Sequence, residues 1–342
     1  MKILAMPALS RAALPLLTRL DPEEAHDLGL AAMRFLLPLW RSPRAAPGLG
    51  LDCMGLQFSH PVGLAAGFDK NADYLDALGA AGFSHIELGT VTPRPQYGNP
   101  KPRMFRIPGS CALVNRMGFN NKGVDHLVAQ LSRSRYGGIR GISIGKNADT
   151  LIDDAHGDYL ECMRKVYPHA DYIAVNVSSP NTARLRELQG SAGLSRILGA
   201  LLEERSALQQ RHGRRVPLLV KVAPDLAQDE ITEIAFDLRS LQVDGVIATN
   251  TSIDKTSLGD VPAAKESGGL SGAPIHAKSI QVIAQLRSEL GPAFPIIGVG
   301  GIVSAQAARE TLLAGASLVQ IYTGFAFRGP ALIEEILSGL AA

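Results

Sequence analysis

Residues 296–324 read IIGVGGIVSAQAARETLLAGASLVQIYTG, and this stretch decides the predicted fold. Two short apolar segments, 296–299 and 318–321, flank a stretch with helical periodicity at 305–314. A strand, a helix and a second strand in this order predict two parallel strands joined by a crossover helix. The rest of the fold is predicted by looking for the same unit toward both ends of the chain.

The strand signal recurs six more times toward the N-terminus, at 62–66, 85–88, 141–144, 172–175, 218–222 and 245–248. Helical patterns fall between or after these segments at 74–81, 123–131, 194–210, 230–241, 275–290 and 331–340. Eight β-then-α units predict an α/β protein with a closed (β/α)₈ TIM barrel, and a doubly wound open sheet is the alternative. The stretches 91–140 and 251–294 are too long for simple connections, so we expect extra strands or loops over the site there.

Composition bounds the class of protein. The chain has 342 residues, 46% of them hydrophobic, which is ample for a large core and argues against disorder. Lys and Arg number 34 and Asp and Glu 32, a net charge of +2 that lacks the basic excess of a nucleic-acid binder. Cys53, Cys111 and Cys162 are far apart and match no metal-ligand spacing, so we expect a reducing cytosolic compartment without disulfides.

The first forty residues predict a separate two-helix unit. Apolar residues recur at helical spacing over 9–20 and again over 28–39. The second helix has a start signal in which Asp21 is the N-cap, Pro22 occupies the first helical position and Glu24 follows the cap by three residues. We therefore expect three parts: an N-terminal amphipathic helical domain at 1–42, a linker at 43–50 and a barrel domain at 51–342.

The role of this unit is open at the level of the residues. No run reaches the ~18–20 apolar residues of a spanning helix, and the best candidate, 28–40, is interrupted by Arg34 and Pro38. A signal peptide is disfavoured because Arg11 interrupts the first apolar stretch and no clean cleavage site follows. The two helices are either a cap on the barrel or an anchor that dips into a bilayer.

Polar residues follow the predicted strands in turn. In a barrel these positions face one mouth, where active sites lie. A single Asn or Lys there is more often a helix cap. Polar residues at so many successive strand ends, however, are hard to explain as caps alone. The residues at these positions are Asp69, Lys70, Thr90, Lys146, Asn147, Asn176, Lys221, Thr249, Asn250, Gly300, Gly301, Tyr322 and Thr323.

Two glycine-bearing turns, GVGG at 298–301 and YTG at 322–324, follow the seventh and eighth strands. Barrels commonly hold a phosphate at these positions, and tight turns are the alternative reading. The chain has no Walker pattern and no G-x-G-x-x-G after an early strand, so a mononucleotide such as a flavin fits better than ATP or NAD. Lys221 would then place positive charge beside the flavin ring, or else it only balances Asp225.

Three segments rich in amides also reach the mouth: NRMGFN at 115–120, NVSSPN at 176–181 and TNT at 249–251. Carboxamides both donate and accept hydrogen bonds, which suits a planar ligand edged with N–H and C=O groups, such as a pyrimidine. Lys70 would add a cation for a ligand carboxylate. Each Asn could instead cap a loop.

At these residues the chain resembles the quinone-dependent, class 2 dihydroorotate dehydrogenases. The matching blocks are AAGFDKN at 65–71, GNPKPRMFR at 98–106, NRMGFN at 115–120, NVSSPN at 176–181 and GGLSG at 268–272. The resemblance implies a barrel with one FMN per chain and oxidation of (S)-dihydroorotate to orotate in pyrimidine biosynthesis. It also implies re-oxidation of the flavin by a membrane quinone that enters through the N-terminal helices, in a peripheral, monomeric protein on the cytoplasmic face of the inner membrane.

The resemblance also assigns residues. It puts the catalytic base at Ser179 and a quinone site at His26, Arg106 and Tyr322. It implies contacts to FMN from Ala65, Ala66, Gly67, Asp69, Thr90, Asn147, Asn176, Lys221, Thr249, Gly272, Gly301, Tyr322 and Thr323. It implies contacts to the substrate from Lys70, Asn115, Arg116, Met117, Gly118, Phe119, Asn176, Asn181, Asn250 and Thr251.

The resemblance separates the class as well. In class 1 relatives the base is a cysteine, whereas no cysteine lies in the NVSSPN block of this chain. A ferredoxin-like cysteine cluster is also absent from the sequence, which argues against an NAD-linked form. Two alternatives remain: a soluble class 1-type FMN enzyme acting on dihydroorotate or another dihydropyrimidine, and a non-catalytic phosphate-binding barrel.

Overall fold

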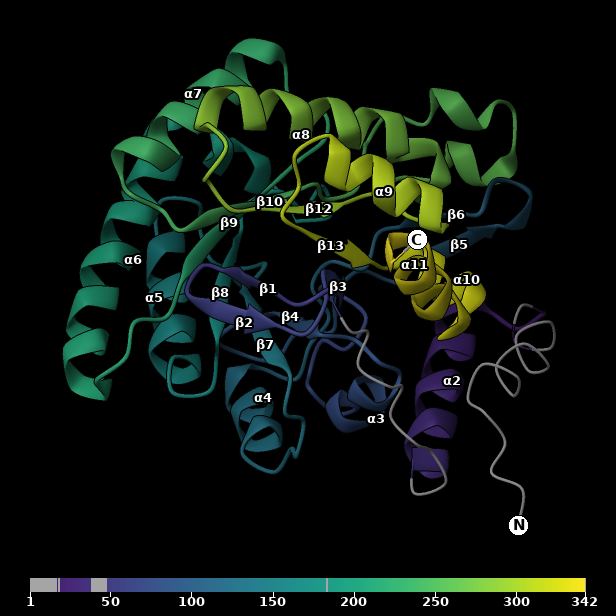
Figure 1. Ribbon diagram of the computed structural model, residues 1–342, viewed down its shortest axis with the longest axis horizontal. Coiled ribbons are helices and arrows are strands. Elements are labelled where there is room, and N and C mark those ends of the chain that lie inside the picture. The colour runs from purple at the N-terminus through teal and green to yellow at the C-terminus, as the bar shows by residue number, and fades with distance from the viewer. Residues whose placement is uncertain (1–16, 18, 38–47, 183, 342) are drawn as a thin grey trace.

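The centre of the molecule is a closed barrel of eight parallel strands (Figure 1). The computed structural model describes residues 17, 19–37, 48–182 and 184–341. All eight predicted strands are present, and pairing of the last with the first excludes the open sheet. In chain order they are β3 (Val62–Leu64), β4 (His85–Val91), β7 (Ile139–Ile144), β8 (Tyr172–Asn176), β9 (Leu218–Val222), β10 (Gly245–Ala248), β12 (Ile296–Val299) and β13 (Leu318–Ile321).

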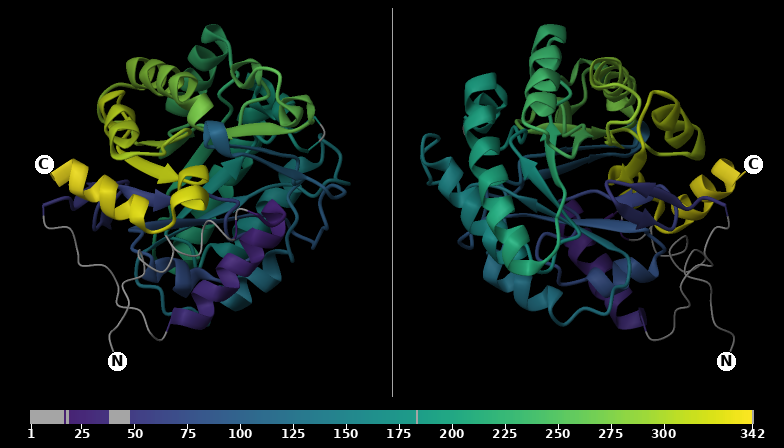
Figure 2. Two further views of the ribbon diagram at one scale, coloured as in Figure 1. Left: turned by 90° about the vertical axis from the view of Figure 1, so that its right-hand side faces the viewer. Right: turned by 60° about the vertical axis from the view of Figure 1, so that its left-hand side comes forward.

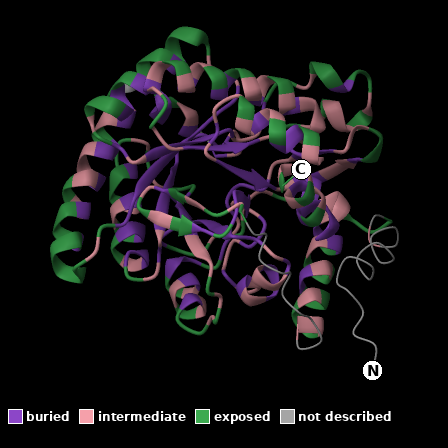
Figure 3. Cartoon of the chain, viewed as in Figure 1, coloured by how far each residue is buried: buried purple, intermediate pink, exposed green. Residues whose placement is uncertain are grey.

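Helices surround this barrel, with their buried faces on the strands and their exposed faces in solvent (Figures 2 and 3). Two of them, α5 and α10, were not among the predicted helices, because α5 mixes apolar and charged residues and α10 starts directly behind the last strand. The helices after the barrel strands are α3 (Leu75–Ala80), α4 (Val124–Leu131), α5 (Ala155–Val166), α6 (Ser191–His212), α7 (Gln228–Ser240), α8 (His276–Leu290), α9 (Ala305–Leu313), α10 (Thr323–Arg328) and α11 (Ala331–Ala341).

The two long insertions meet over the mouth of the barrel, and the extra strands expected in them are confirmed. β5 (Met104–Ile107) and β6 (Ala112–Asn115) form an antiparallel pair, and β11 (Gly269–Gly272) adds to the free edge of β6. Val114 and Leu270 are fully buried beneath this small sheet. The sheet therefore forms one wall of the mouth from residues that are about 150 positions apart in the chain.

A hairpin closes the opposite end of the barrel. β1 (Leu51–Cys53) and β2 (Leu56–Phe58) pair with each other and with no other strand of the described chain. Phe58 joins an apolar cluster with Tyr172 and Leu318, which are the first residues of their strands. In the described chain the hairpin therefore covers the end of the barrel where the strands begin.

The N-terminal unit is described only in part. α2 (Pro22–Leu36) begins as predicted, because Asp21 accepts hydrogen bonds from the backbone N–H groups of Glu23 and Glu24 at 2.9 and 3.2 Å. It ends three residues before the predicted end at 39. Nearly all of the predicted first helix, 9–20, and most of the linker, 43–50, lie outside the described residues.

α2 lies on the outside of the barrel beside α3 and β5 (Figure 1). A buried ion pair holds it there: Arg103 Nη2 and Nε donate to the two carboxylate oxygens of Glu23 at 2.6 and 3.1 Å. Arg103 Nη1 also donates to the carbonyls of Tyr97 and Asn99. Burial alone would raise the pKa of Glu23, but the contacts with Arg103 outweigh it and hold that pKa below its usual value.

The opposite face of α2 is exposed and carries large apolar side chains. Phe35 is 83% exposed and Leu28 53% exposed, whereas Leu30 on the inner face is buried. In the part of the chain that the structure describes, no helix is long and apolar enough to span a bilayer.

Candidate active site

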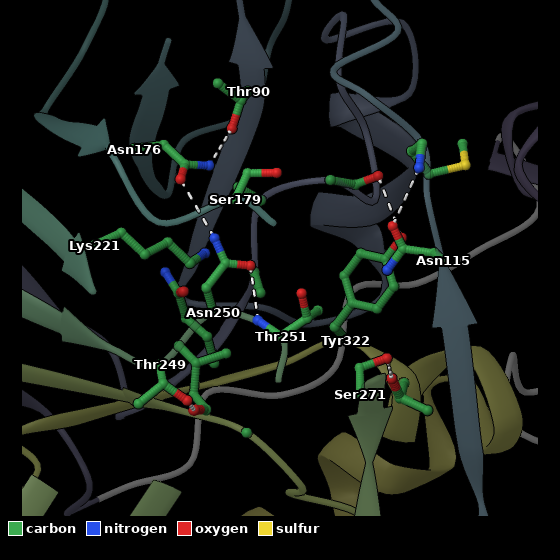
Figure 4. Close-up of a pocket in the computed structure, with 18 of the residues that line it drawn as sticks. Thr90, Asn115, Asn176, Ser179, Lys221, Thr249, Asn250, Thr251, Ser271 and Tyr322 are labelled. Carbon is green, nitrogen blue, oxygen red and sulfur yellow. Dashed lines mark hydrogen bonds between the residues drawn. The ribbon is translucent and has the colours of Figure 1, made fainter. Parts of the chain in front are cut away.

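The barrel mouth contains a cavity of about 980 Å³ that opens to solvent (Figure 4). The strand ends of the barrel and the sheet of β5, β6 and β11 contribute its walls. The predicted site residues that line it are Ala65, Ala66, Gly67, Lys70, Thr90, Asn115, Met117, Gly118, Phe119, Asn176, Ser179, Asn181, Lys221, Thr249, Asn250, Thr251, Gly272, Gly301, Tyr322 and Thr323.

A buried polar network forms the floor of the cavity. Glu87 is completely buried, and its carboxylate accepts hydrogen bonds from Lys221 Nζ at 3.2 Å, from Gln320 Nε2 at 2.9 Å and from the Tyr172 hydroxyl at 3.2 Å. A buried carboxylate requires a paired cation, and Lys221 supplies it. The alternative that Lys221 balances Asp225 is therefore wrong.

Amide side chains form a connected wall above this floor. Asn176 Nδ2 donates to Thr90 Oγ1 at 2.8 Å, and Asn250 Nδ2 lies 3.3 Å from Asn176 Oδ1. Asn181 Nδ2 donates to Asn115 Oδ1 at 3.1 Å. Each amide is thereby held in one orientation, so the remaining donors and acceptors are preorganised for a ligand.

Three buried polar atoms at the cavity lack a partner among the described residues: Gln320 Oε1, Asn181 Oδ1 and Thr251 Oγ1. An unsatisfied buried polar atom costs about 1–3 kcal/mol. All three belong to side chains that line the cavity. These atoms therefore favour a polar ligand that supplies the missing hydrogen bonds.

One corner of the cavity is made of backbone rather than side chains. Gly272, Gly300 and Gly301 have φ angles of 100°, 132° and 71°, which favour glycine. A Cβ atom on Gly301 would lie 2.5 Å from that of His276. Beside this corner the Thr323 hydroxyl donates to Ser271 Oγ at 2.8 Å. Exposed backbone amides at the glycines, with hydroxyl groups beside them, suit a phosphate. This corner therefore fits the phosphate of a mononucleotide.

Ser179 lies in the wall of the same cavity (Figure 4). Its side chain is almost fully buried, with 6% of the residue exposed. In the described chain its hydroxyl has one hydrogen bond, accepted from the backbone N–H of Asn181 at 3.3 Å. Its own proton and its second lone pair are therefore available to a ligand.

Asp69 was predicted to contact the cofactor, but the structure does not bring it to the cavity. Its carboxylate accepts hydrogen bonds from the backbone N–H groups of Asn71, Asp73 and Tyr74, at 3.3, 3.1 and 2.8 Å. Burial raises the pKa of Asp69 to about 6. Asp69 shapes the loop that presents Lys70.

Asn147 and Arg116 also lie outside the cavity lining. The Asn147 amide donates to Thr92 Oγ1 and Gln96 Oε1, so its hydrogen-bonding capacity is used within the loops. The Arg116 guanidinium donates to Glu266 at 2.5 Å and is turned away from the mouth. Both residues support cavity loops, and it was the family resemblance that assigned them to the predicted site.

The lining residues that were not assigned to a ligand are Ser271, Ile275, Val299, Gly300, Ile302, Gln320 and Gly324. Three of them, Val299, Gly300 and Gly324, lie in the two glycine turns that the sequence predicted to hold a phosphate. Gln320 had a usable signal, because it is the lone polar residue inside an otherwise apolar strand. In a barrel such a residue must face either the interior or a buried helix, and both positions require partners.

A second, smaller cavity of about 510 Å³ lies between α2 and the barrel. Predicted quinone-site residues His26 and Tyr322 line it, whereas Arg106 does not. Arg106 instead donates to the carbonyl of Leu20 at 3.2 Å, directly before the N-cap residue of α2. Lys70 and Tyr322 line both cavities, so the two cavities share a wall.

His26 is neutral at physiological pH, because burial lowers its pKa to about 4. Its Nε2 lies 2.8 Å from the carbonyl oxygen of Phe68, which can only accept, so Nε2 carries the proton and Nδ1 is an acceptor. In this state His26 Nδ1 can accept a hydrogen bond from a hydroxyl group. Because the Nε2 proton is used by the Phe68 carbonyl, neither ring nitrogen of His26 is free to donate a hydrogen bond to a quinone carbonyl.

The fold and this mouth define a TIM-barrel protein with a polar cavity at the ends of its strands. A sequence model described as "Dihydroorotate dehydrogenase" matches residues 49–342. Proteins named "Dihydroorotate dehydrogenase (quinone)" from Cellvibrio japonicus and Bordetella avium are each 53% identical, with 96% of both chains covered. The chain belongs to the dihydroorotate dehydrogenase family.

Solved structures agree with this assignment. A crystal structure of DHODH from Eimeria tenella in complex with ferulenol has a TM-score of 0.88 and 37% sequence identity, covering 94% of this chain and 90% of that one. The ligand-free form from the same organism has a TM-score of 0.86 at the same identity.

Proposed function

We propose that this chain oxidises (S)-dihydroorotate to orotate in pyrimidine biosynthesis and passes the electrons through FMN to a membrane quinone. The observation that carries the proposal is one cavity that contains both the glycine corner with Lys221 and the amide wall with Ser179. A class 1-type enzyme is not favoured, because the curated relatives are named as quinone-dependent and Ser179 stands where class 1 relatives have a cysteine.

The cofactor side of the cavity is assigned to FMN. When bound, FMN would supply the hydride acceptor for substrate C6 and the route for electrons to quinone. Lys221, held by Glu87, would place a positive charge beside the ring. The residues of the cavity that would hold the group are Ala65, Ala66, Gly67, Thr90, Asn176, Lys221, Thr249, Gly272, Gly301, Tyr322 and Thr323.

The substrate side carries the amides and a cation. Asn115, Asn176, Asn181 and Asn250 would bind the N–H and C=O edge of the ring, because their amides are already oriented by one another. Lys70 would bind the substrate carboxylate. Met117, Gly118, Phe119 and Thr251 complete this part of the lining.

Ser179 is assigned the proton transfer. Oxidation removes a hydride from C6 and a proton from C5, and the Ser179 hydroxyl, which is buried in the cavity wall, would accept that proton. A serine hydroxyl is a weak base, so it must pass its own proton onward as it takes the new one. Ser179 therefore acts as a relay.

The function is tested by adding dihydroorotate to the purified protein under anaerobic conditions and following the flavin absorbance. We expect the flavin to be bleached and then restored by a soluble quinone but not by fumarate. A protein that contains no flavin would support the non-catalytic barrel. Bleaching by dihydroorotate with re-oxidation by fumarate would support the class 1 alternative.

The affinity for substrate is expected to depend on the charge of Lys70. Burial lowers the pKa of Lys70 to about 8. Below that pH the ammonium can pair with a carboxylate, and above it the charge is lost, so binding weakens as pH rises. We expect the dihydroorotate concentration that half-saturates flavin reduction to be flat from about pH 6.5 to 7.5 and to rise about tenfold per unit above pH 8.

The matched control is Lys70→Gln. This variant should bind dihydroorotate weakly at every pH, with no break near pH 8. Stopped-flow measurements of flavin reduction, from about pH 6.5 to about pH 9.5, give the half-saturating dihydroorotate concentration for both proteins. A wild-type profile without a break would show that Lys70 does not carry the substrate carboxylate.

The N-terminal part, 1–42, is assigned to membrane association and to quinone access, with 43–50 as the linker to the catalytic part, 51–342. In this proposal the protein is a peripheral monomer on the cytoplasmic face of the inner membrane. Support comes from the exposed apolar face of α2, which has Phe35 and Leu28 on its outer side and the smaller cavity with His26 on its inner side. An amphipathic helix of this kind inserts its apolar side chains ~5–10 Å into a bilayer.

Membrane binding is expected to depend on two exposed side chains. The double substitution Phe35→Ser and Leu28→Ser should reduce co-sedimentation with anionic vesicles by about tenfold or more. Burial of each exposed side chain in the lipid would contribute about 1.5–3 kcal/mol to the free energy of binding. Reduction of the flavin by dihydroorotate should not change.

Leu313→Ser is the matched control, because Leu313 is 80% exposed on α9 and outside the N-terminal unit. This variant should sediment like the wild type. Equal vesicle binding by the double variant and the wild type would reduce α2 to a structural cap.

A further inference from the structure

Arg186 joins three catalytic loops without touching the cavity. It lies in the short 3₁₀ helix η3 (Leu185–Gln189), and it is not among the residues that line the mouth. Its Nε donates to the carbonyl of Ser178 at 3.1 Å, its Nη1 to Asp225 Oδ2 at 3.0 Å and its Nη2 to the carbonyl of Thr251 at 2.8 Å. One planar guanidinium thus connects the segments that follow β8, β9 and β10.

The two carbonyls belong to segments that carry site residues. Ser178 directly precedes Ser179, and Thr251 directly follows Asn250. Inside the cavity wall the same two segments meet again, where Asn250 Nδ2 lies 2.9 Å from Ser178 Oγ and 3.3 Å from Asn176 Oδ1. Arg186 therefore fixes from the outside how far the base segment lies from the substrate segment.

Asp225 anchors this arrangement. Besides Arg186, its carboxylate accepts hydrogen bonds from the backbone N–H of Ile253 at 2.9 Å, from Lys278 Nζ at 3.2 Å and from the Ser252 hydroxyl. Burial works to raise the pKa of Asp225, but these hydrogen bonds outweigh it and hold the pKa below its usual value. The anchor is thus an ionised carboxylate in a fixed place.

We propose that Arg186 is a positioning residue for the oxidation half-reaction. Through its hydrogen bonds to the carbonyls of Ser178 and Thr251, Arg186 sets the distance between Ser179 and the substrate. The inference rests on the proposed function. The fork geometry is what matters: guanidinium presents planar donors in fixed directions, whereas an ammonium is a point charge on a flexible stem. A lysine at this position would keep the ion pair with Asp225 and lose the simultaneous bonds to both carbonyls.

Arg186→Lys is therefore the informative variant. A displacement of about 1 Å at a reacting group costs up to about 10²-fold in rate. We expect the rate of flavin reduction at saturating dihydroorotate to fall about 10- to 100-fold, with FMN content unchanged. The Kd of orotate, measured by its effect on the flavin spectrum, should change less than about threefold, because Arg186 does not contact the ligand.

The second half-reaction separates positioning from general damage. Re-oxidation of the reduced flavin by a soluble quinone should proceed at the wild-type rate, since Arg186 contacts neither the glycine corner nor the cavity beside α2. The matched control is Arg184→Ala. Arg184 precedes η3 and forms an exposed ion pair with Glu187, so this variant should behave as the wild type in both half-reactions.

Asp225→Asn is the second test, because it removes the anchoring charge and keeps the side chain's shape. Like Arg186→Lys, this variant should reduce its flavin more slowly than the wild type. If Arg186→Lys fails to fold with FMN, the rate of Asp225→Asn decides whether the inference holds. Reduction at the wild-type rate in a folded Arg186→Lys or, failing that, Asp225→Asn protein would overturn the inference. Failure of dihydroorotate to reduce the wild-type flavin would instead overturn the proposed function.

Discussion

Replacing Ser179 with alanine is expected to slow flavin reduction by dihydroorotate by about 10²–10⁴-fold at neutral pH. The side chain is buried in the cavity wall, and in the described chain its hydroxyl has one hydrogen bond, from the backbone of Asn181. Removing the hydroxyl therefore leaves the wall intact and deletes the acceptor for the C5 proton. Stopped-flow absorbance under anaerobic conditions measures the rate, and FMN content should match that of the wild type.

Ser179→Cys sharpens this test. A thiolate is a stronger base than a serine hydroxyl, and an unperturbed thiol has a pKa of about 8.5. The cysteine variant should therefore recover part of the lost rate, and its rate should rise with pH as the thiol ionises. Re-oxidation by quinone should be normal in both variants. Wild-type reduction by Ser179→Ala would show that a different group takes the proton.

Replacing Lys221 with alanine is expected to have the second largest effect, on both cofactor and stability. Lys221 is the cation that neutralises Glu87 at the cavity floor. Removal of one partner of a buried ion pair leaves an uncompensated charge, which costs about 3–5 kcal/mol. We expect the variant to lose most of its FMN and to unfold at a lower temperature than the wild-type apoprotein.

A double variant separates the two effects. Lys221→Met combined with Glu87→Gln removes both charges while keeping side chains of similar size, so the apoprotein should regain most of the lost stability. FMN binding should remain weak, because the cation beside the ring is still missing. Thermal unfolding of the apoproteins and flavin titration measure the two quantities. Full FMN occupancy in Lys221→Ala, with an unchanged reduction potential, would contradict the assignment of Lys221 to the cofactor.

The prediction from sequence was strongest for local features. All eight barrel strands were identified, because each is a short, largely apolar run, and all but the one at 141–144 are followed by a predicted helix. Asp21 and Pro22 marked the start of α2 correctly. Both signals depend on neighbouring residues alone. Helix α5 was not predicted, because its mixed composition leaves the buried face to be defined by its neighbours.

The site was predicted in part for a related reason. Residues at strand ends share one rim in any barrel, so Asn176, Lys221 and Thr249 were placed at the mouth correctly. Asp69 and Asn147 satisfy the same rule of position, yet the Asp69 side chain is used by its own loop and the Asn147 side chain by the neighbouring loop that follows β4. Position along a strand predicts which rim a residue joins, but the direction of its side chain depends on the hydrogen bonds that compete for it.

The sequence by itself determined the alternation of strands and helices, and hence the barrel and the rim where the chemistry lies, because periodicity acts over a few residues. Only the tertiary structure decided which polar groups meet. Lys221 and Glu87 are 134 positions apart, and Arg186 reaches Thr251 across 65. Pairing over such distances depends on barrel closure, which brings side chains together in a low-dielectric interior where each buried charge or polar group must find a partner.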